Sequence, residues 1–292
     1  MEALDFKALL EQERKAMTKR LGSSVPASND GATSMLRKID TASLQRFQAE
    51  GPSSSSATLP PITLVDQPKL KLEEFRVGSI PSIFYIPDFV TEVDEQSILS
   101  WIYAIPDGPE WKTLRTRRLQ CWGGQPGKDF LPEPLPPWMD PLCDNLVARG
   151  VIKEEDRLNH ILLNEYQPGQ GILAHTDGPY YAPLVATLSL GSDAIMHFSP
   201  RVRADEIGRV DTDPVSSLVL RRRCLVVFTE KAYTELLHSI DAVSTETVGA
   251  WGEGGVINGR AAGLLEGTQI ERQRRISLTF RRVLGRTGEE GR

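Results

Sequence analysis

The sequence predicts a mainly β fold with flanking helices, of the sandwich, barrel or jelly-roll type. From about residue 160 the chain is a series of short apolar segments separated by Gly, Pro and Asp, beginning with HILLNEY and ending with RRISLTFRRV. Two helices are expected before them. TEVDEQSILSWIYAI has Thr91 as an N-cap and Asp94 three residues later, and a Pro-rich loop leads into a second helix around Met139–Arg149.

Composition limits the class of protein. The chain has 292 residues, 40% hydrophobic and 25% charged, enough for one large domain with appendages or two small ones. No apolar run approaches the roughly 18 residues of a membrane-spanning helix, and the N-terminus is too charged for a secretory signal. Three widely spaced cysteines predict reduced thiols in an intracellular protein, and with no signal or anchor the chain is expected in the cytoplasm, the nucleus or both. A net charge of −5 argues against a general polyanion binder but leaves room for a local basic patch.

Shifts in composition divide the chain into segments. Residues 1–21 are expected to form a charged helix, either solvated or bound to a protein partner. Residues 22–70 are rich in Ser, Pro and Gly and are expected to form a disordered linker, because they cannot bury enough apolar surface. The folded domain is expected over 75–286, with a Gly-rich surface loop at 247–269 inserted between its last strands. Residues 287–292 are expected to be a disordered tail.

The stretch NEYQPGQGILAHTDGP has polar residues at the spacing of a metal site. His175 and Asp177 are two apart at a strand end, so both side chains point to one face and can meet one ion. A third ligand from a distant strand would complete a two-histidine, one-carboxylate set, which suits Fe(II) and leaves positions open for a cosubstrate and oxygen. Asn164 and Tyr166 also share a face, with a Pro-Gly turn after them. Taken alone, the stretch is equally consistent with a polar hairpin that carries a histidine.

The last strand alternates strictly between apolar and polar residues. Ile276, Leu278 and Phe280 would face a core, and the opposite face would carry Arg275, Ser277, Thr279 and Arg281. Two arginines on one face are costly to bury without an anion, and a small dicarboxylate meets that need because guanidinium binds carboxylate through two hydrogen bonds. The alternative is an exposed edge strand whose arginines are solvated.

Taken together, these features resemble the AlkB family of Fe(II)- and 2-oxoglutarate-dependent dioxygenases. That family's pattern is N-x-Y, H-x-D, a distal His and R-x-N-x-T-x-R. The matching elements are, in order, Asn164/Tyr166, His175/Asp177, His238 and Arg275/Thr279/Arg281. The resemblance covers roughly residues 75–286 and is closest to the subgroup of the sixth mammalian AlkB homologue, on landmarks that include LQCWGG, PEPLPPW and AYTELLHSI.

The resemblance implies a double-stranded β-helix, also described as a jelly roll or cupin-like fold. It implies that His175, Asp177 and His238 hold Fe(II); His197 is the other candidate for the distal ligand, and His160 is expected to support the site or the fold. The dicarboxylate would be 2-oxoglutarate, with O₂ as the second cosubstrate, and the residues implied to bind it are Asn164, Tyr166, Arg275, Ser277, Thr279 and Arg281. Which arginine takes which carboxylate stays open, although the family pattern assigns Arg275 to the distal one.

The substrate implied by the resemblance is alkylated nucleic acid, DNA or RNA, which would be oxidatively demethylated. Basic and aromatic residues that fall where the family builds a substrate lid or lie beside the metal are tentative contacts: Arg115, Arg117, Arg118, Trp122, Tyr180 and Tyr181. Two positions depart from the pattern. Ser277 replaces Asn in the last motif, and Pro179 stands where repair members carry an acid near the target base.

Two other functions remain open from the sequence. The same oxygenase chemistry on a protein side chain or small molecule is favoured by Pro179 and by the acidic net charge. A non-catalytic protein of the same fold that binds nucleic acid or a partner is disfavoured by the intact His-Asp-His set and the paired arginines.

Overall fold

The computed structural model describes residues 59–108, 111–127, 129–201 and 214–284. The chain divides into two units, Asp5–Pro60 and Pro61–Arg292 with Met1–Leu4. The expected N-terminal helix, most of the linker and the C-terminal tail lie outside the described residues. The fold described is that of the second unit.

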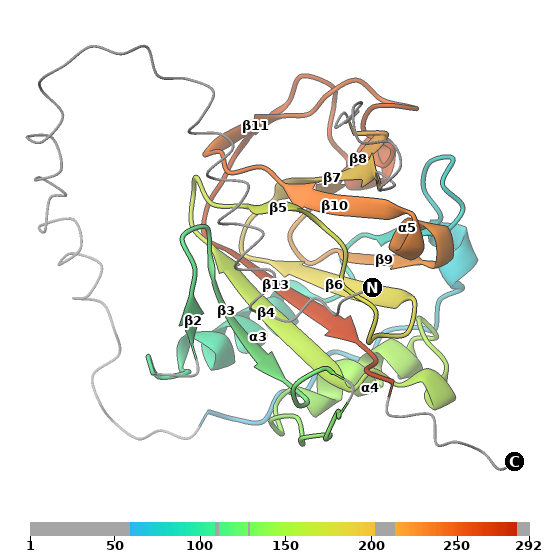
Figure 1. The fold of residues 1–292 in the computed structure, drawn as a ribbon. Helices are drawn as coiled ribbons and strands as arrows, with labels where there is room; N and C mark the ends of the chain where they lie inside the picture. Colours follow the sequence, from blue (N-terminus) through green and yellow to red (C-terminus); the bar gives the residue numbers. More distant parts are fainter. Residues whose placement is uncertain (1–58, 109–110, 128, 202–213, 285–292) are drawn as a thin grey trace, which may run out of the picture. The chain divides into compact units, whose positions relative to one another are not determined.

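Two antiparallel sheets form the body of the domain (Figure 1). The larger sheet has seven strands, in the order β1 (Ile83–Ile86), β9 (Leu225–Thr229), β6 (Leu184–Leu190), β13 (Arg275–Arg281), β4 (His160–Tyr166), β3 (Arg118–Trp122) and β2 (Lys112–Thr113). The smaller sheet has four strands, in the order β5 (Ile172–His175), β10 (Leu236–Ile240), β7 (Ala194–Pro200) and β8 (Ser216–Leu220). A separate hairpin pairs β11 (Thr245–Thr247) with β12 (Gln269–Glu271).

Helices cover the outer face of the larger sheet, on the side away from the smaller one (Figure 1). The two main helices are α3 (Glu92–Tyr103) and α4 (Asp140–Ala148), and Thr91 and Asp94 form the expected capping box at the start of α3. The remaining short elements are η1 (Leu72–Phe75), η2 (Glu154–Asp156), α5 (Glu230–Thr234) and α6 (Gly259–Ala262). None of the helices in the described ranges is long and apolar enough to cross a membrane.

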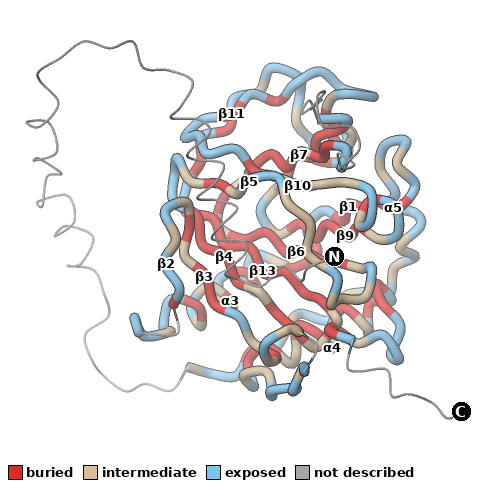
Figure 2. The backbone as a smooth tube through the Cα atoms, in the orientation of Figure 1, coloured by how far each residue is buried: buried red, intermediate tan, exposed pale blue. Residues whose placement is uncertain are grey.

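Strand β13 is central, not an exposed edge. It pairs with β4 on one side and β6 on the other, and all seven of its residues are buried (Figure 2). Ile276, Leu278 and Phe280 belong to the apolar core under the helices, as the alternation predicts. The polar residues of β13 therefore face the smaller sheet, where they are removed from water.

The space between the two sheets has an apolar part and a polar part. Beneath β7 and β8 lies a second apolar core, which includes Phe198, Leu218 and Phe228. Beneath β5 and β10, the inner faces of β4 and β13 carry polar side chains instead. The amphipathic pattern of these two strands thus produces a buried polar region next to a dry apolar one.

Two expected boundaries differ from the structure. Residues 61–70, assigned by composition to the linker, lie against the domain: Ile62 is buried in the core under the helices, and the Leu70 amide donates to Arg149 O. The stretch 247–269 is not simply a surface loop, because Val248 and Val256 are buried and α6 lies within it. A few apolar side chains in these polar stretches are enough to attach them to the core.

Candidate metal centre

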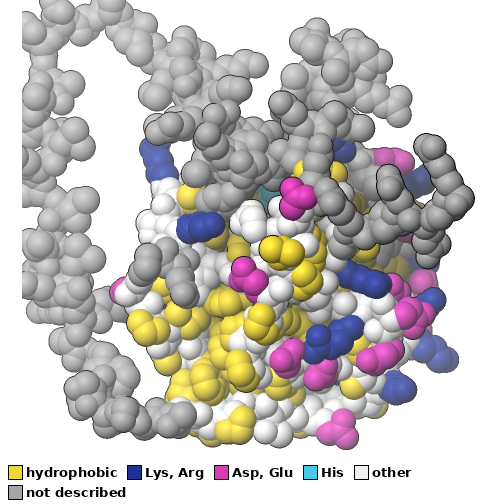
Figure 3. Space-filling model, turned by 60° about the horizontal axis from the view of Figure 1, so that its bottom comes forward, with side chains coloured by type: hydrophobic (Ala, Val, Ile, Leu, Met, Phe, Trp, Pro, Cys, Tyr) yellow, Lys and Arg dark blue, Asp and Glu magenta, His cyan; other side chains and the backbone are white. Residues whose placement is uncertain are grey.

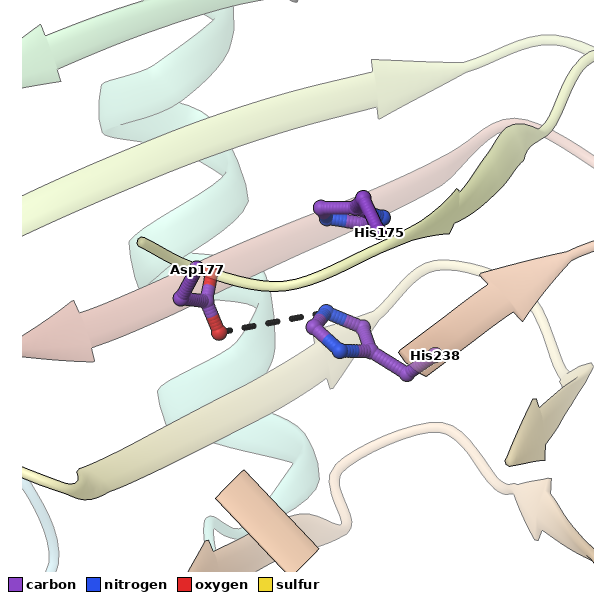
Figure 4. A group of neighbouring side chains, drawn as sticks. All are labelled: His175, Asp177 and His238. Atoms are coloured by element: carbon purple, nitrogen blue, oxygen red, sulfur yellow. Dashed lines mark ion pairs between the residues drawn. The ribbon is translucent and has the colours of Figure 1, made fainter. Parts of the chain in front are cut away.

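His175, Asp177 and His238 come together where β5 pairs with β10 at the edge of the smaller sheet (Figure 4). His175 ends β5 and is the direct partner of His238 on β10, so strand register brings the two imidazoles together, with ring centroids 4.2 Å apart. Asp177 follows two residues later, and its Oδ2 lies 3.9 Å from His238 Nε2. One ligand atom from each residue lies within 4.8 Å of the others.

The two histidines are in the protonation state that allows a ring nitrogen to bind a cation. His175 Nδ1 lies 2.8 Å from Leu173 O, which can only accept, so the proton is on Nδ1 and Nε2 keeps its lone pair. Burial, with His238 next to it, lowers the pKa of His175 to about 3, and burial also lowers that of His238. Both rings are therefore neutral at physiological pH.

Asp177 is ionised. Burial alone would raise its pKa, but Arg281 and the two histidines more than offset this and hold the pKa below the usual value. Arg281 Nη2 donates to Asp177 Oδ1, while Oδ2 has no hydrogen-bond partner within the described chain. One carboxylate oxygen is thus fixed by a cation, and the other is aimed at the histidines.

The second buried arginine lies at the other end of β13. Arg275 is completely buried, and its Nη2 donates to Ser189 Oγ at 2.8 Å. Its guanidinium carbon lies 5.6 Å from the Tyr166 ring centre, but Nε and Nη1 have no hydrogen-bond partner in the described part of the chain. Burial lowers the pKa of this group. A buried guanidinium with two unused donors is well suited to receive a carboxylate.

The remaining predicted polar residues lie between these two arginines. Asn164 pairs with Ser277 across β4 and β13, and Ser277 Oγ lies 3.5 Å from Thr279 Oγ1. Arg117 donates from Nε to Asn164 Oδ1 at 3.0 Å and is almost completely buried. The structure therefore brings all nine predicted metal and cosubstrate residues into one region, and adds Arg117 to it.

The sequence pattern of the 2OG-Fe(II) oxygenase superfamily matches residues 85–281, which include the whole of this region. The chain belongs to that superfamily. It is 36% identical over 217 residues to a zebrafish (Danio rerio) protein named "Probable RNA/DNA demethylase ALKBH6", covering 73% of this chain and 90% of that protein. It is 29% identical over 121 residues to the "RNA demethylase ALKBH5" of Bos taurus, covering 39% of this chain and 30% of that one. The solved structure of OsALKBH1 aligns with 71% of this chain at 16% identity and a TM-score of 0.47.

The protein is therefore an AlkB-type Fe(II)- and 2-oxoglutarate-dependent dioxygenase that uses O₂. The resemblance drawn from the sequence is confirmed, and the two facing antiparallel sheets are the double-stranded β-helix that it implied. The side chains fit the cofactors: two neutral imidazoles and one carboxylate match the donors that Fe(II) prefers, and an unpaired buried guanidinium matches a dicarboxylate.

His197 lies elsewhere in this oxygenase. Its Nδ1 is 2.8 Å from Ser217 Oγ, and its Nε2 is 3.7 Å from Asp241 Oδ2, on the outer side of the smaller sheet. Because neighbouring residues on a strand point to opposite faces, Ser239 points outward with His197 and His238 points inward. Of the two candidate distal histidines, only His238 reaches the H-x-D pair.

The tentative substrate residues of the oxygenase are dispersed. Arg118 and Trp122 point to the helix-covered face of the larger sheet, away from the metal centre: Arg118 pairs with buried Glu165 at 2.6 Å, and Trp122 packs edge-on against Trp138. Their basic and aromatic character had suggested a lid, but strand alternation sends them to the core side. Arg115 is exposed between β2 and β3.

Two of the tentative substrate residues lie at the site: Arg117, which donates to Asn164, and Tyr181. The Tyr181 ring lies 5.0 Å from the guanidinium carbon of Arg281 and 5.4 Å from the ring centre of His160. Tyr180 is half-buried next to it, and Pro179 is exposed. His160 is buried, and neither ring nitrogen has a hydrogen-bond partner in the described chain.

Several residues of the site carry no clear signal in the sequence. Ser189, which holds Arg275, belongs to LVATLSL, where Thr187 and Ser189 alternate with apolar residues and could have revealed a polar inner face. Tyr233 donates its hydroxyl to Gly178 O at 2.6 Å, directly after the metal cluster. No sequence signal marks that contact, because it joins segments 55 residues apart.

Acid is expected to destabilise the oxygenase in part through His160. Burial, and then Arg281, lowers the pKa of this imidazole from 6.5 to about 3. A depressed folded-state pKa means that its contribution to stability is complete above about pH 6.5 and is lost as the pH falls toward 3, because the unfolded chain takes up the proton first. Equilibrium denaturation should show that the free energy of unfolding falls less between pH 7.5 and pH 5.5 for His160→Gln than for wild type. An equal loss would contradict this account.

Proposed function

We propose that this oxygenase removes methyl groups from the bases of alkylated nucleic acid. The observation that carries the proposal is an iron-type His-Asp-His cluster at one end of β13 and, at the other end, a buried arginine with no carboxylate partner among the described residues, in a chain 36% identical to a protein named as a probable RNA/DNA demethylase. His175, Asp177 and His238 would hold Fe(II). Arg281 would keep the Asp177 carboxylate ionised and oriented while its second oxygen faces the metal.

The positions of the two arginines support one assignment of the cosubstrate carboxylates. Arg281 lies at the metal end because it bonds to Asp177, and Arg275 is six residues away on the same strand, about 20 Å at the backbone. We assign the 2-oxo acid end of 2-oxoglutarate to the Arg281 end and the distal carboxylate to Arg275. Tyr166, Asn164 and the two hydroxyls of β13 would line the molecule between them, and the hydroxyl of Ser277 would serve in place of the family's Asn.

Bound iron, 2-oxoglutarate and O₂ together supply the oxidising power to hydroxylate a nearby C–H bond, with succinate and carbon dioxide as by-products. On an N-methyl group the hydroxylated product is a hemiaminal, which breaks down to formaldehyde and the demethylated amine. Tyr181, which lies beside Arg281, would form a wall for an extruded base, since aromatic rings stack on every base.

A second substrate class, a protein side chain or small molecule, is favoured by specific observations. Pro179 stands where repair members of the family carry an acidic side chain near the target base, so that acid is missing. On the face shown in Figure 3, basic side chains are interspersed with acidic ones among the visible described residues. Several arginines are already paired, such as Arg157 with Asp140 and Asp144. Paired arginines contribute less to phosphate binding, which depends on free positive charge.

Formaldehyde release distinguishes the two classes. The full chain with Fe(II) would be incubated with oligonucleotides that carry single N-methylated bases, as DNA and RNA, and in parallel with methylated lysine and arginine peptides. We expect formaldehyde and succinate in equal amounts from at least one oligonucleotide, and none with Asp177→Ala. Coupled turnover found only with peptides or metabolites would reject nucleic-acid demethylation and leave the oxygenase chemistry intact.

We further propose that the enzyme works in the cytoplasm, the nucleus or both. The three cysteines are free thiols, which fits a reducing compartment. A protein partner for the N-terminal helix remains a proposal, because that helix falls outside the described residues.

A further inference from the structure

A buried ion pair between Arg272 and Glu246 includes a residue only three positions before Arg275 in the chain. Arg272 and Glu246 have side chains that are 1% and 6% exposed, and Arg272 Nη1 lies 3.1 Å from Glu246 Oε2. Arg272 follows β12 and precedes Arg275 by three residues, while Glu246 is the middle residue of β11. The pair therefore joins β11, at the base of the Gly-rich insertion, to the short connection that leads from β12 into β13.

Backbone contacts fix both members of the pair. Glu246 Oε2 accepts from the Ile195 amide at 3.0 Å, which ties β11 to β7 of the smaller sheet. Arg272 Nη2 lies 3.4 Å from Gln170 O, in the turn between β4 and β5, and the Arg272 amide donates to Ser244 O. The two charges are thus held in place and do not depend on each other alone for their position.

The charges near Arg275 do not balance. Arg272 and Arg275 are two buried guanidiniums, and Glu246 is the one carboxylate paired with either of them in the described chain. Arg272 lies three residues before Arg275 in the chain; burial lowers the pKa of Arg275, Tyr166 and Glu246 raise it, and Arg272 lowers it. One positive charge remains without a partner, which is the charge needed for a single carboxylate.

We propose that Glu246 and Arg272 are positioning residues that set the charge at the distal end of the cosubstrate site. Glu246 neutralises Arg272, and Arg272 keeps Glu246 away from Arg275, so that Arg275 alone receives the distal carboxylate. This inference rests on the proposed role of Arg275. It also makes cosubstrate binding depend on the insertion, since Glu246 stands at its base.

Arg272→Gln and Glu246→Gln should change the affinity for 2-oxoglutarate in opposite directions. Arg272→Gln leaves Glu246 unpaired near Arg275, where it competes with the dicarboxylate, and we expect about a tenfold or greater loss of 2-oxoglutarate affinity. Glu246→Gln leaves Arg272 uncompensated and adds attraction, so we expect affinity equal to or higher than that of wild type. The double variant restores one net positive charge and should bind within about threefold of wild type.

Isothermal titration calorimetry of the Mn(II)-loaded full chain measures the affinity for 2-oxoglutarate without turnover. The ligands are 2-oxoglutarate and 2-oxopentanoate, which has the same chain length but no distal carboxylate. We expect the substitutions to change the affinity for 2-oxoglutarate only, and thermal melts of each loaded variant identify any that fail to fold. The double variant keeps the test valid if one single variant is unstable.

Two outcomes separate the failure of this inference from the failure of the proposed function. If wild type binds both ligands equally, the role of Arg275 is wrong. If wild type prefers 2-oxoglutarate but both single variants lower its affinity alike, or lower the affinity for both ligands, the pair has only a structural role and the inference is overturned.

Discussion

His175→Ala is expected to abolish turnover, with a loss of at least about 10³-fold, corresponding to roughly 4 kcal/mol. The reason is geometric: His175 and His238 meet as direct partners across β5 and β10, and Asp177 completes the set within 4.8 Å. Removing one imidazole leaves two ligands, which bind Fe(II) too weakly to hold it. Anaerobic addition of Fe(II) and 2-oxoglutarate to wild type should give the weak visible absorption of this cofactor pair, and the variant should lack it.

His197→Ala is the matched control, because His197 lies on the same sheet but faces outward toward Ser217. It should retain iron, the visible band and turnover. If well-folded wild type gave no band, or if His197→Ala lost the band while His175→Ala kept it, the assigned ligand set would be wrong.

Arg275→Met is expected to weaken 2-oxoglutarate binding by roughly 100-fold, since losing one partner of a buried charge pair costs about 2–5 kcal/mol. The variant keeps most of the side-chain volume and should retain the iron. Without cosubstrate it should be at least as stable as wild type, because wild-type Arg275 is wholly buried with two donors that have no partner in the described chain. The measurements are the affinity for 2-oxoglutarate and the melting temperature with and without it.

The pattern of stability distinguishes a binding role from a structural one. If Arg275 had only a structural role in the sheet, Arg275→Met would have a lower melting temperature than wild type in the absence of 2-oxoglutarate. Its affinity for 2-oxoglutarate would then fall in proportion to that loss of stability. Arg275→Lys should recover part of the affinity, since an ammonium supplies the charge but not the two-pronged geometry of guanidinium. Wild-type affinity in Arg275→Met would exclude the assignment.

Much of this enzyme could be predicted because the relevant patterns are local. Two-residue spacing places His175 and Asp177 on one face, and strict alternation in β13 separates Ile276 from Arg275. The helix cap at Thr91 depends on residues within one turn. Each of these follows from backbone geometry over a few residues, and each is found in the structure.

The sequence by itself thus determined the strand pattern, the H-x-D pair and the placement of two arginines on one face of the last strand. Only the tertiary structure decided which histidine completes the metal cluster and which arginines turn inward. Arg117 and Arg118 are adjacent and chemically identical, yet one bonds to Asn164 inside the site and the other to Glu165 on the helix side. The register between β3 and β4 determines which arginine faces the site. That register depends on pairing between segments 47 residues apart, so it cannot be predicted from a local sequence pattern.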